Sequence, residues 1–265
     1  MRLENLVKKY FINKYTLTFL GILLFLAFWY VLYLIAGSTE AIFPDPFSTI
    51  KEMFIYLGEA YTYKCILGSL ERMLIGFGVA SILGILVGMI VGNFTNLKYV
   101  FNPTIIALKA IPTAAIVFLF LVLAGLKNAP VYVVFIIVFP MVYEATVSGY
   151  NHIDSNIINA LKVDGKNGFY SNFKVKLPLS FPYIALGLLT SFALSFKIEI
   201  MAEVISGSSS YGIGRAIQSS YINSSNGMVP TFAYSLIAIV VMLIVTLIFD
   251  IVKKYTGLEE LTKTN

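Results

Sequence analysis

Residues 149–178, GYNHIDSNIINALKVDGKNGFYSNFKVKLP, lie between two long apolar stretches and carry the most informative pattern in the chain. Asp154 or Ser155 can cap a helix over 156–163, because either side chain accepts a hydrogen bond from a free amide of the first turn. Gly165 can adopt the left-handed conformation that ends such a helix. The segment therefore begins with a short, well-delimited helix.

A second short helix is predicted beyond this glycine. Residues 167–176 can form it, and Pro178 suits the first turn of the apolar helix that follows. Two short helices at an angle form a knob that can dock into a groove on a cytosolic protein. The alternative is a basic, solvated loop, since lysine and arginine are common in cytoplasmic loops for topological reasons alone.

The composition around this segment is that of a membrane protein. Of 265 residues, 19 are basic and 14 acidic, so the charged share is 12%, against about 25% in soluble domains. Hydrophobic residues make up 58% of the chain and the mean hydropathy is +0.83, which is more apolar surface than a water-soluble globule can cover. Cys65 is the only cysteine and His152 the only histidine, so we expect neither a disulfide scaffold nor a metal site.

Six stretches are apolar over about 20 residues or more, the length that a helix needs to cross a bilayer about 30 Å thick. We predict an all-α polytopic membrane protein with about six transmembrane helices, over 16–36, 66–92, 99–124, 129–149, 181–205 and 231–252. The first stretch is too long for the apolar region of a cleaved signal peptide. The loops leave no room for a second domain, so we predict a single transmembrane domain over 1–265 with its core at 66–252.

Six spans place both termini on one side of the membrane, and lysine and arginine decide which side. They are concentrated in the N-terminal segment 1–15, in the loops after the second and fourth spans, and in the tail 253–265: Arg2, Lys8, Lys9, Lys14, Lys98, Lys162, Lys166, Lys174, Lys176, Lys253, Lys254 and Lys263. The loops on the opposite side contain Lys51, Lys64, Lys127 and Arg215. We therefore predict that both termini and the segment 155–178 are cytoplasmic.

The segment 155–178 resembles the EAA loop of ABC importer permeases, whose pattern is E-A-A-x-x-x-G-x(9)-I-x-L-P. The residues that match this spacing are Ala160, Gly165, Val175 in place of isoleucine, Leu177 and Pro178, with Asp164 as a common neighbour of the glycine. Asn159 stands where glutamate is usual, and Leu161 where alanine is usual. The resemblance implies that Asn159, Ala160, Asp164, Gly165, Val175, Leu177 and Pro178 couple the chain to an ATPase, with one charge fewer than usual.

The resemblance extends from about Phe43 to Asp250, through motifs of nitrate, sulfonate and taurine importer permeases. These motifs, in the family's order, are Phe43-Pro44-Asp45-Pro46, Ser69-Leu70-Glu71-Arg72 with Gly76-Phe77, Lys109-Ala110-Ile111-Pro112, Gly149 with Asp154, Ala202-Glu203, and Gly212-Ile213-Gly214.

The resemblance implies a permease subunit of the type I ABC importer fold in a bacterial plasma membrane, usually a homodimer. Its partners would be two copies of a cytosolic ABC ATPase, an extracytoplasmic substrate-binding protein, a second copy of itself and the lipid bilayer, without nucleic acid. It implies no catalytic residue and no cofactor in this chain, because the ATPase binds ATP and magnesium. The implied solute is a small anion such as a sulfonate, taurine or nitrate, or a vitamin precursor.

Charged residues inside the predicted spans are candidates for the translocation pathway, because a charge at the centre of a bilayer costs about 2.5–3.5 kcal/mol and therefore faces a cavity or a partner. The candidates are Lys109, Glu144, Lys197, Glu199 and Glu203. Glu144 either adapts the pathway to a cationic or amino-bearing solute or pairs with Lys109 or Lys197. Lys109 can also compensate for the helix end created by Pro112.

Glu199 and Glu203 are four residues apart and share one helix face, where like charges repel. Either one of them is protonated, or a cation compensates. Lys197 points to another side of the same helix and is no obvious partner. Glu71 and Arg72 lie near the outer end of their span, where they can snorkel toward water.

Small residues also recur at regular spacing in the second span. Gly84, Gly88 and Gly92 recur every four residues, which predicts a smooth face for close helix packing. Outside the spans, the serine- and glycine-rich segment 206–214 is predicted to be external, either as a contact for the binding protein or as a plain loop.

The chain lacks the G-x-x-x-x-G-K-[ST] loop that binds nucleotides, so driven transport needs a partner ATPase or an ion gradient. The alternative function is an ion-coupled secondary transporter of a small organic solute, for which internal repeats are typical and none is evident here. An intramembrane metalloprotease needs more than one histidine. A plain membrane anchor would have no use for polar spans.

Overall fold

The computed structural model describes residues 14–39, 42–165, 168–207, 211–223 and 227–255, and these residues form helices and connecting turns. The helices are α2 (Lys14–Ile35), α3 (Pro46–Leu57), α4 (Ala60–Asn93), α5 (Thr95–Ala110), α6 (Thr113–Asn151), α7 (Ser155–Val163), α8 (Phe169–Ser171), the π-helical turn η1 (Asn172–Lys176), α9 (Leu177–Ser206), α10 (Ile213–Ile222) and α11 (Val229–Tyr255). Most of both predicted tails, and Ser208, Ser209 and Ser210 of the predicted external segment, lie outside the described residues.

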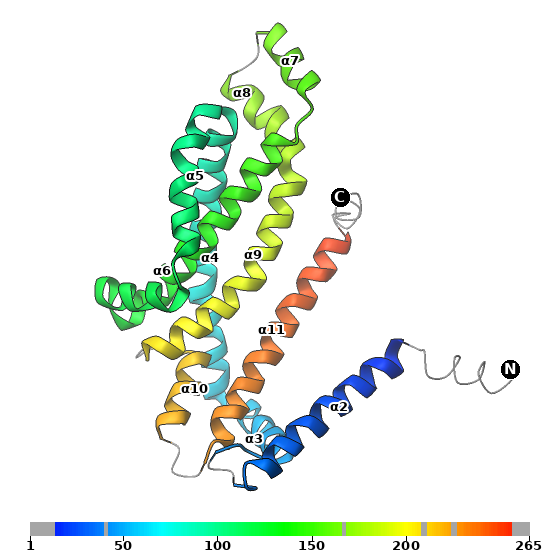
Figure 1. Ribbon diagram of the computed structural model, residues 1–265, viewed down its shortest axis with the longest axis vertical. Helices are drawn as coiled ribbons and strands as arrows, with labels where there is room; N and C mark the ends of the chain where they lie inside the picture. The colour runs from blue at the N-terminus through cyan, green and yellow to red at the C-terminus, as the bar shows by residue number, and fades with distance from the viewer. Residues whose placement is uncertain (1–13, 40–41, 166–167, 208–210, 224–226, 256–265) are drawn as a thin grey trace, which may run out of the picture.

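Helices α4, α6 and α9 form the centre of the bundle and run side by side (Figure 1). Helices α7 and α8 lie at one end of this bundle, and α3 and α10 lie at the opposite end (Figure 1). Helix α2 extends away from the bundle beside α3, and its side chains are largely exposed. The two short helical regions at the ends are therefore separated by the length of the long helices.

The close approach of α4 to α6 depends on glycine. A Cβ atom at Gly84 would lie 2.9 Å from the Cβ of Val142, and one at Gly88 would lie 2.6 Å from the Cβ of Thr146. The next glycine toward the end of α4, Gly92, is equally close to a residue of α6. The prediction of a smooth, close-packing glycine face is confirmed.

The apolar core spreads from this contact to α9. Val134, Val138 and Val142 of α6 pack with Ala80 of α4 and Ala202 of α9. Small and β-branched side chains at these positions allow the three helices to approach closely over much of their length.

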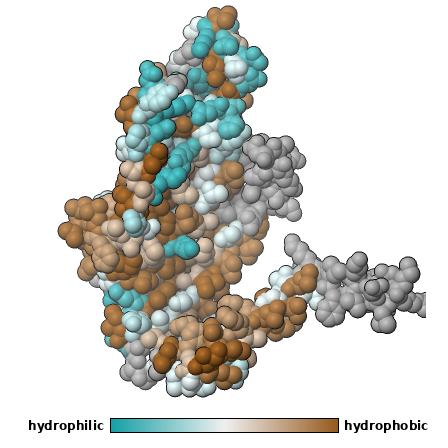
Figure 2. All heavy atoms as spheres, viewed as in Figure 1, coloured by the Kyte–Doolittle hydropathy of each residue, from teal (hydrophilic) through white to brown (hydrophobic). Residues whose placement is uncertain are grey.

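Five helices in the described part of the chain are long and apolar enough to cross a membrane: Thr16–Ile35, Ala60–Asn93, Thr113–Asn151, Asn172–Ser206 and Val229–Ile248. The all-helical membrane fold is confirmed, with five such helices described where about six spans were predicted, because the predicted span 129–149 and part of the predicted span 99–124 lie in the one helix Thr113–Asn151. Figure 2 agrees with it, since hydrophobic side chains dominate the visible face of the bundle and hydrophilic ones gather around α7 and α8.

The prediction of one continuous span over 99–124 is wrong, because the stretch is divided between two helices. Helix α5 ends at Ala110, because Pro112 lacks an amide proton and holds Ile111 in an extended conformation with φ −71° and ψ 126°. The rest of the predicted span is the beginning of α6, which is broken at Gly125 with φ 75° and ψ 168°. The stretch therefore consists of two helical pieces that meet at a proline.

Candidate functional site

The segment between α6 and α9 has the local structure that its sequence predicts. Asp154 caps α7, and its Oδ1 accepts a hydrogen bond of 2.8 Å from the amide of Asn156. Gly165 follows the helix with φ 66°, the left-handed conformation that a glycine adopts without strain. The predicted second helix forms as α8 and η1, and Pro178 lies in the first turn of α9. These local predictions are confirmed.

The residues predicted to couple the chain to an ATPase fall into two groups in space. Asn159, Ala160, Asp164 and Gly165 are exposed on α7 and just beyond it, at the far end of the molecule (Figure 1). The remaining residues, Val175, Leu177 and Pro178, form the junction of η1 with α9. The structure thus joins the exposed knob to a central helix of the bundle.

Helix α7 presents an apolar surface that the described part of the chain leaves open. None of its nine residues is buried, and Val163 is 87% exposed. Tyr170 and Phe173, in the turns that follow, are also exposed. Apolar side chains at the hydrophilic end of a membrane protein are typical of a surface that a partner protein covers.

A second candidate site is a cavity of about 650 Å³ between α5, α6 and α9. Lys109, in the last turn of α5, forms an ion pair with Glu144 of α6, and the distance from Nζ to Oε2 is 2.8 Å. Both side chains line the cavity and are 49% and 44% exposed. The interpretation that Glu144 pairs with Lys109 is confirmed, and the pair faces open space.

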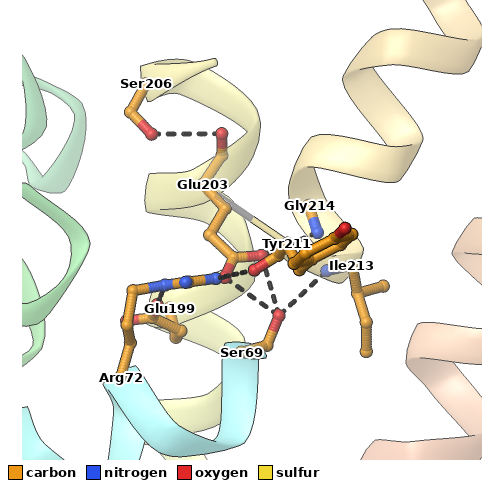
Figure 3. A network of polar contacts seen from close by, with 8 residues as sticks. All are labelled: Ser69, Arg72, Glu199, Glu203, Ser206, Tyr211, Ile213 and Gly214. Carbon is orange, nitrogen blue, oxygen red and sulfur yellow. Dashed lines mark hydrogen bonds and ion pairs between the residues drawn. The ribbon is translucent and has the colours of Figure 1, made fainter. Parts of the chain in front are cut away.

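Glu199 and Glu203 of α9 are fully buried and form a network with Arg72 of α4 (Figure 3). The Nε of Arg72 lies 3.1 Å from Glu199 Oε1, and its Nη2 contacts Glu203 Oε1. Ser69, one turn before the arginine, donates a hydrogen bond of 2.9 Å to the Glu203 carboxylate. A cation from another helix therefore pairs with both acids, and its one positive charge balances one of their two negative charges. Protonation of one of the acids, the other alternative left open by their spacing, stays a prediction.

The same network fixes the start of α10 (Figure 3). The amide of Gly214 donates to Glu203 Oε2 at 2.8 Å, and the amide of Ile213 donates to Ser69 Oγ at 2.9 Å. Arg72 donates to the carbonyl of Tyr211 at 2.7 Å. The start of α10 can lie this close to α9 because residue 214 is glycine. A Cβ atom at this position would be only 2.6 Å from the Cβ of Glu203.

Residues 80–256 match the family model of the binding-protein-dependent transport system inner membrane component. This match covers most of the chain, including the α7 segment and the elements that line the cavity, whereas Ser69 and Arg72 of the buried network precede it. The chain belongs to this family.

Relatives of this permease support the assignment. It is 31% identical over 215 residues to the bicarbonate transport system permease protein CmpB of Synechococcus elongatus, with 76% of this chain and 75% of that protein covered. It is 26% identical over 191 residues to the putative aliphatic sulfonates transport permease protein SsuC of Bacillus subtilis, covering 71% of this chain and 68% of that protein.

A solved structure shows the same fold. The permease matches a chain of the inward-facing MetNI methionine ABC transporter with a TM-score of 0.62 and 12% sequence identity, over 74% of this chain and 95% of that chain. The resemblance inferred from the EAA-like loop is thereby confirmed at the level of family and fold.

Arg72 is the residue of the permease whose place the sequence interpretation missed. It was expected to snorkel outward, yet its side chain turns inward and is 12% exposed, whereas its neighbour Glu71 is exposed. Lys197, in contrast, is exposed and forms no ion pair with any described residue. A pathway role for Lys197, Glu199 and Glu203 stays a prediction.

Proposed function

We propose that this permease subunit forms the translocation pathway of an ATP-driven importer together with a second copy of itself. Each copy docks on one cytosolic ABC ATPase through α7, and an extracytoplasmic substrate-binding protein delivers a small solute at the end that holds α3 and α10. Both termini are cytoplasmic in this arrangement. ATP and magnesium bind to the ATPase, and this chain contributes conformational change rather than chemistry.

The observation that carries the proposal is the exposed knob of α7. Its caps delimit a helix of nine residues, its side chains are unburied, and Val163 is left for a partner to cover. Lys162 and Lys174 lie in the same segment, which by the distribution of basic residues belongs on the cytoplasmic side. Movement of the knob reaches the membrane part directly, since η1 continues into α9.

The cavity beside the Lys109–Glu144 pair supports a pathway between two copies. Contact of this half-exposed ion pair with lipid would cost too much free energy, whereas water or another protein surface can solvate the two charges. A second copy placed against this face would enclose the cavity as a water-filled route. Alternating access then requires two states of similar free energy, between which nucleotide binding and hydrolysis shift the population.

The solute is proposed to be small and polar. Two relatives of this permease are named for the transport of bicarbonate and of aliphatic sulfonates, which are small and polar. Selection among them is expected to rest mainly on the binding protein, which this chain meets only at its outer end.

The test is an affinity purification of the tagged permease from native membranes in mild detergent. We expect a Walker-motif ATPase to co-purify with the wild type and to be lost from Gly165→Arg, because φ 66° suits glycine and the new side chain adds charge beside α7. Gly168→Arg is the matched control, since this exposed glycine has no positive φ and nothing within 4 Å of an added Cβ. Absence of an ATPase from the wild-type sample rejects the proposal in favour of ion-coupled transport.

A further inference from the structure

The cavity between α5, α6 and α9 holds one positive and one negative charge. Among the described residues that line it, Lys109 and Glu144 are the charged ones, and Glu144 receives two contacts from the lysine, at 2.8 and 2.9 Å. The charges of the lining therefore cancel. A pathway shaped only for an anion would present positive charge and amide donors and would have no use for a carboxylate beside them.

The rest of the lining divides into apolar walls and a few hydroxyl groups. Ile116, Ile136 and Met141 contribute apolar surface, and Thr113 and Thr190 contribute hydroxyls. Pro140 in the wall cannot donate to the carbonyl of Ile136, which is one turn earlier on α6 and also lines the cavity. The volume of about 650 Å³ lies within the range of small-molecule sites.

The geometry points to a solute that carries an ammonium group and an anionic group together, a zwitterion of no net charge, bound between Glu144 and Lys109. This inference rests on the proposed function and specifies its solute class. A lone anion that binds Lys109 takes the lysine away from Glu144 and leaves that carboxylate unpaired. A lone cation leaves Lys109 unpaired for the same reason. A zwitterion opens the ion pair and satisfies both of its members.

The exposure of the pair makes this exchange feasible. Each side chain is nearly half exposed to the cavity, so that a solute reaches both charged groups without unfolding any helix. In the buried network of Arg72, by contrast, Glu199 and Glu203 have no exposed surface through which a solute could enter. Lys109 and Glu144 are therefore the residues that we expect to determine which solutes the permease binds.

The experiment measures binding of three matched probes to the permease with its co-purified ATPase in lipid nanodiscs, without the binding protein. The probes are β-alanine, propionate, which lacks the ammonium group, and ethylammonium, which lacks the carboxylate. We expect the wild type to bind β-alanine about tenfold more tightly than either fragment. A tenfold difference in affinity lies between the contribution of an exposed ion pair and that of a buried one. Glu144→Gln should shift the preference to propionate, and Lys109→Gln should shift it to ethylammonium.

Two further variants separate this effect from a general loss of structure. Exchange of the charges in Lys109→Glu/Glu144→Lys keeps the pair and should keep the preference for β-alanine. Lys98→Gln removes a positive charge from the same helix, outside the cavity lining, and should leave all three affinities unchanged.

The inference is overturned if propionate binds the wild type as tightly as β-alanine, if none of the three probes binds, or if the preference survives both single substitutions. ATP hydrolysis is measured on the same nanodiscs. A sample without an ATPase contradicts the proposed function, whereas a working ATPase without probe discrimination contradicts the solute class alone.

Discussion

Arg72 of α4 and Glu203 of α9 are 131 positions apart in the sequence and form an ion pair whose side chains are 12% and 0% exposed. Glu199 shares the same guanidinium, and its second carboxylate oxygen has no hydrogen-bond partner among the described residues. The pair joins two central helices to the start of α10. Among the described residues, Arg72 is therefore the one cation that pairs with these two buried acids.

Replacement of Arg72 by methionine is expected to destabilise the permease by about 3–5 kcal/mol, because it leaves two carboxylates buried without a cation. The adjacent substitution Glu71→Met is the control, since Glu71 is exposed and its loss should change stability by about 0.5 kcal/mol or less. Thermal unfolding in detergent compares the two. Equal unfolding temperatures would show that the buried network contributes nothing to stability.

The two buried serines of α4 should respond differently to alanine. Ser69 donates to Glu203 and accepts from the amide of Ile213, so Ser69→Ala should cost about 1–3 kcal/mol. The hydroxyl of Ser81 has no hydrogen-bond partner among the described residues, and Ser81→Ala should be neutral or slightly stabilising. Denaturant titration of both variants measures the difference, and a larger loss at Ser81 would contradict the assigned hydrogen bonds.

The glycine face of α4 gives another matched comparison. A methyl group at Gly88 would meet Thr146 at 2.6 Å, so Gly88→Ala should separate α4 from α6 and cost about 1–3 kcal/mol. Gly78 on the same helix has nothing within 4 Å, and Gly78→Ala should change stability by about 1 kcal/mol or less. The yield of folded protein by size-exclusion chromatography and its unfolding temperature test this. Wild-type behaviour of Gly88→Ala would mean that the helices are not in close contact there.

The features that could be predicted from sequence are those that a short stretch of chain determines. Asp154 and Gly165 delimit α7 through their own backbone and side-chain geometry, and Gly88 marks a close-packed face through a spacing of four. The break at Pro112 was also a local signal. Pro112 was expected to end a helix beside Lys109, yet one span was drawn over 99–124 because the apolar run continued past the proline, and hydrophobicity alone does not show where a helix ends.

The long-range pairings could not be predicted in the same way. Two acids on one face of α9 required either a protonated carboxyl or a cation, and their spacing did not say which helix would supply the cation. Lys109 was one possible partner of Glu144, and only the packing of α5 on α6 brings the two within 2.8 Å. Partner choice depends on which helices are neighbours, and that information is distributed over the whole chain.

Site-specific photocrosslinking in intact cells tests directly whether α7 is the coupling helix, with p-benzoylphenylalanine placed at Ala160 on α7 or at Tyr221 on α10. Both positions are exposed, and they lie on helices at opposite ends of the molecule (Figure 1). We predict that the probe at Ala160 forms an adduct with a cytosolic ATPase and that the probe at Tyr221 does not. An ATPase adduct from Tyr221, or none from Ala160, would contradict the assignment of α7 as the coupling helix.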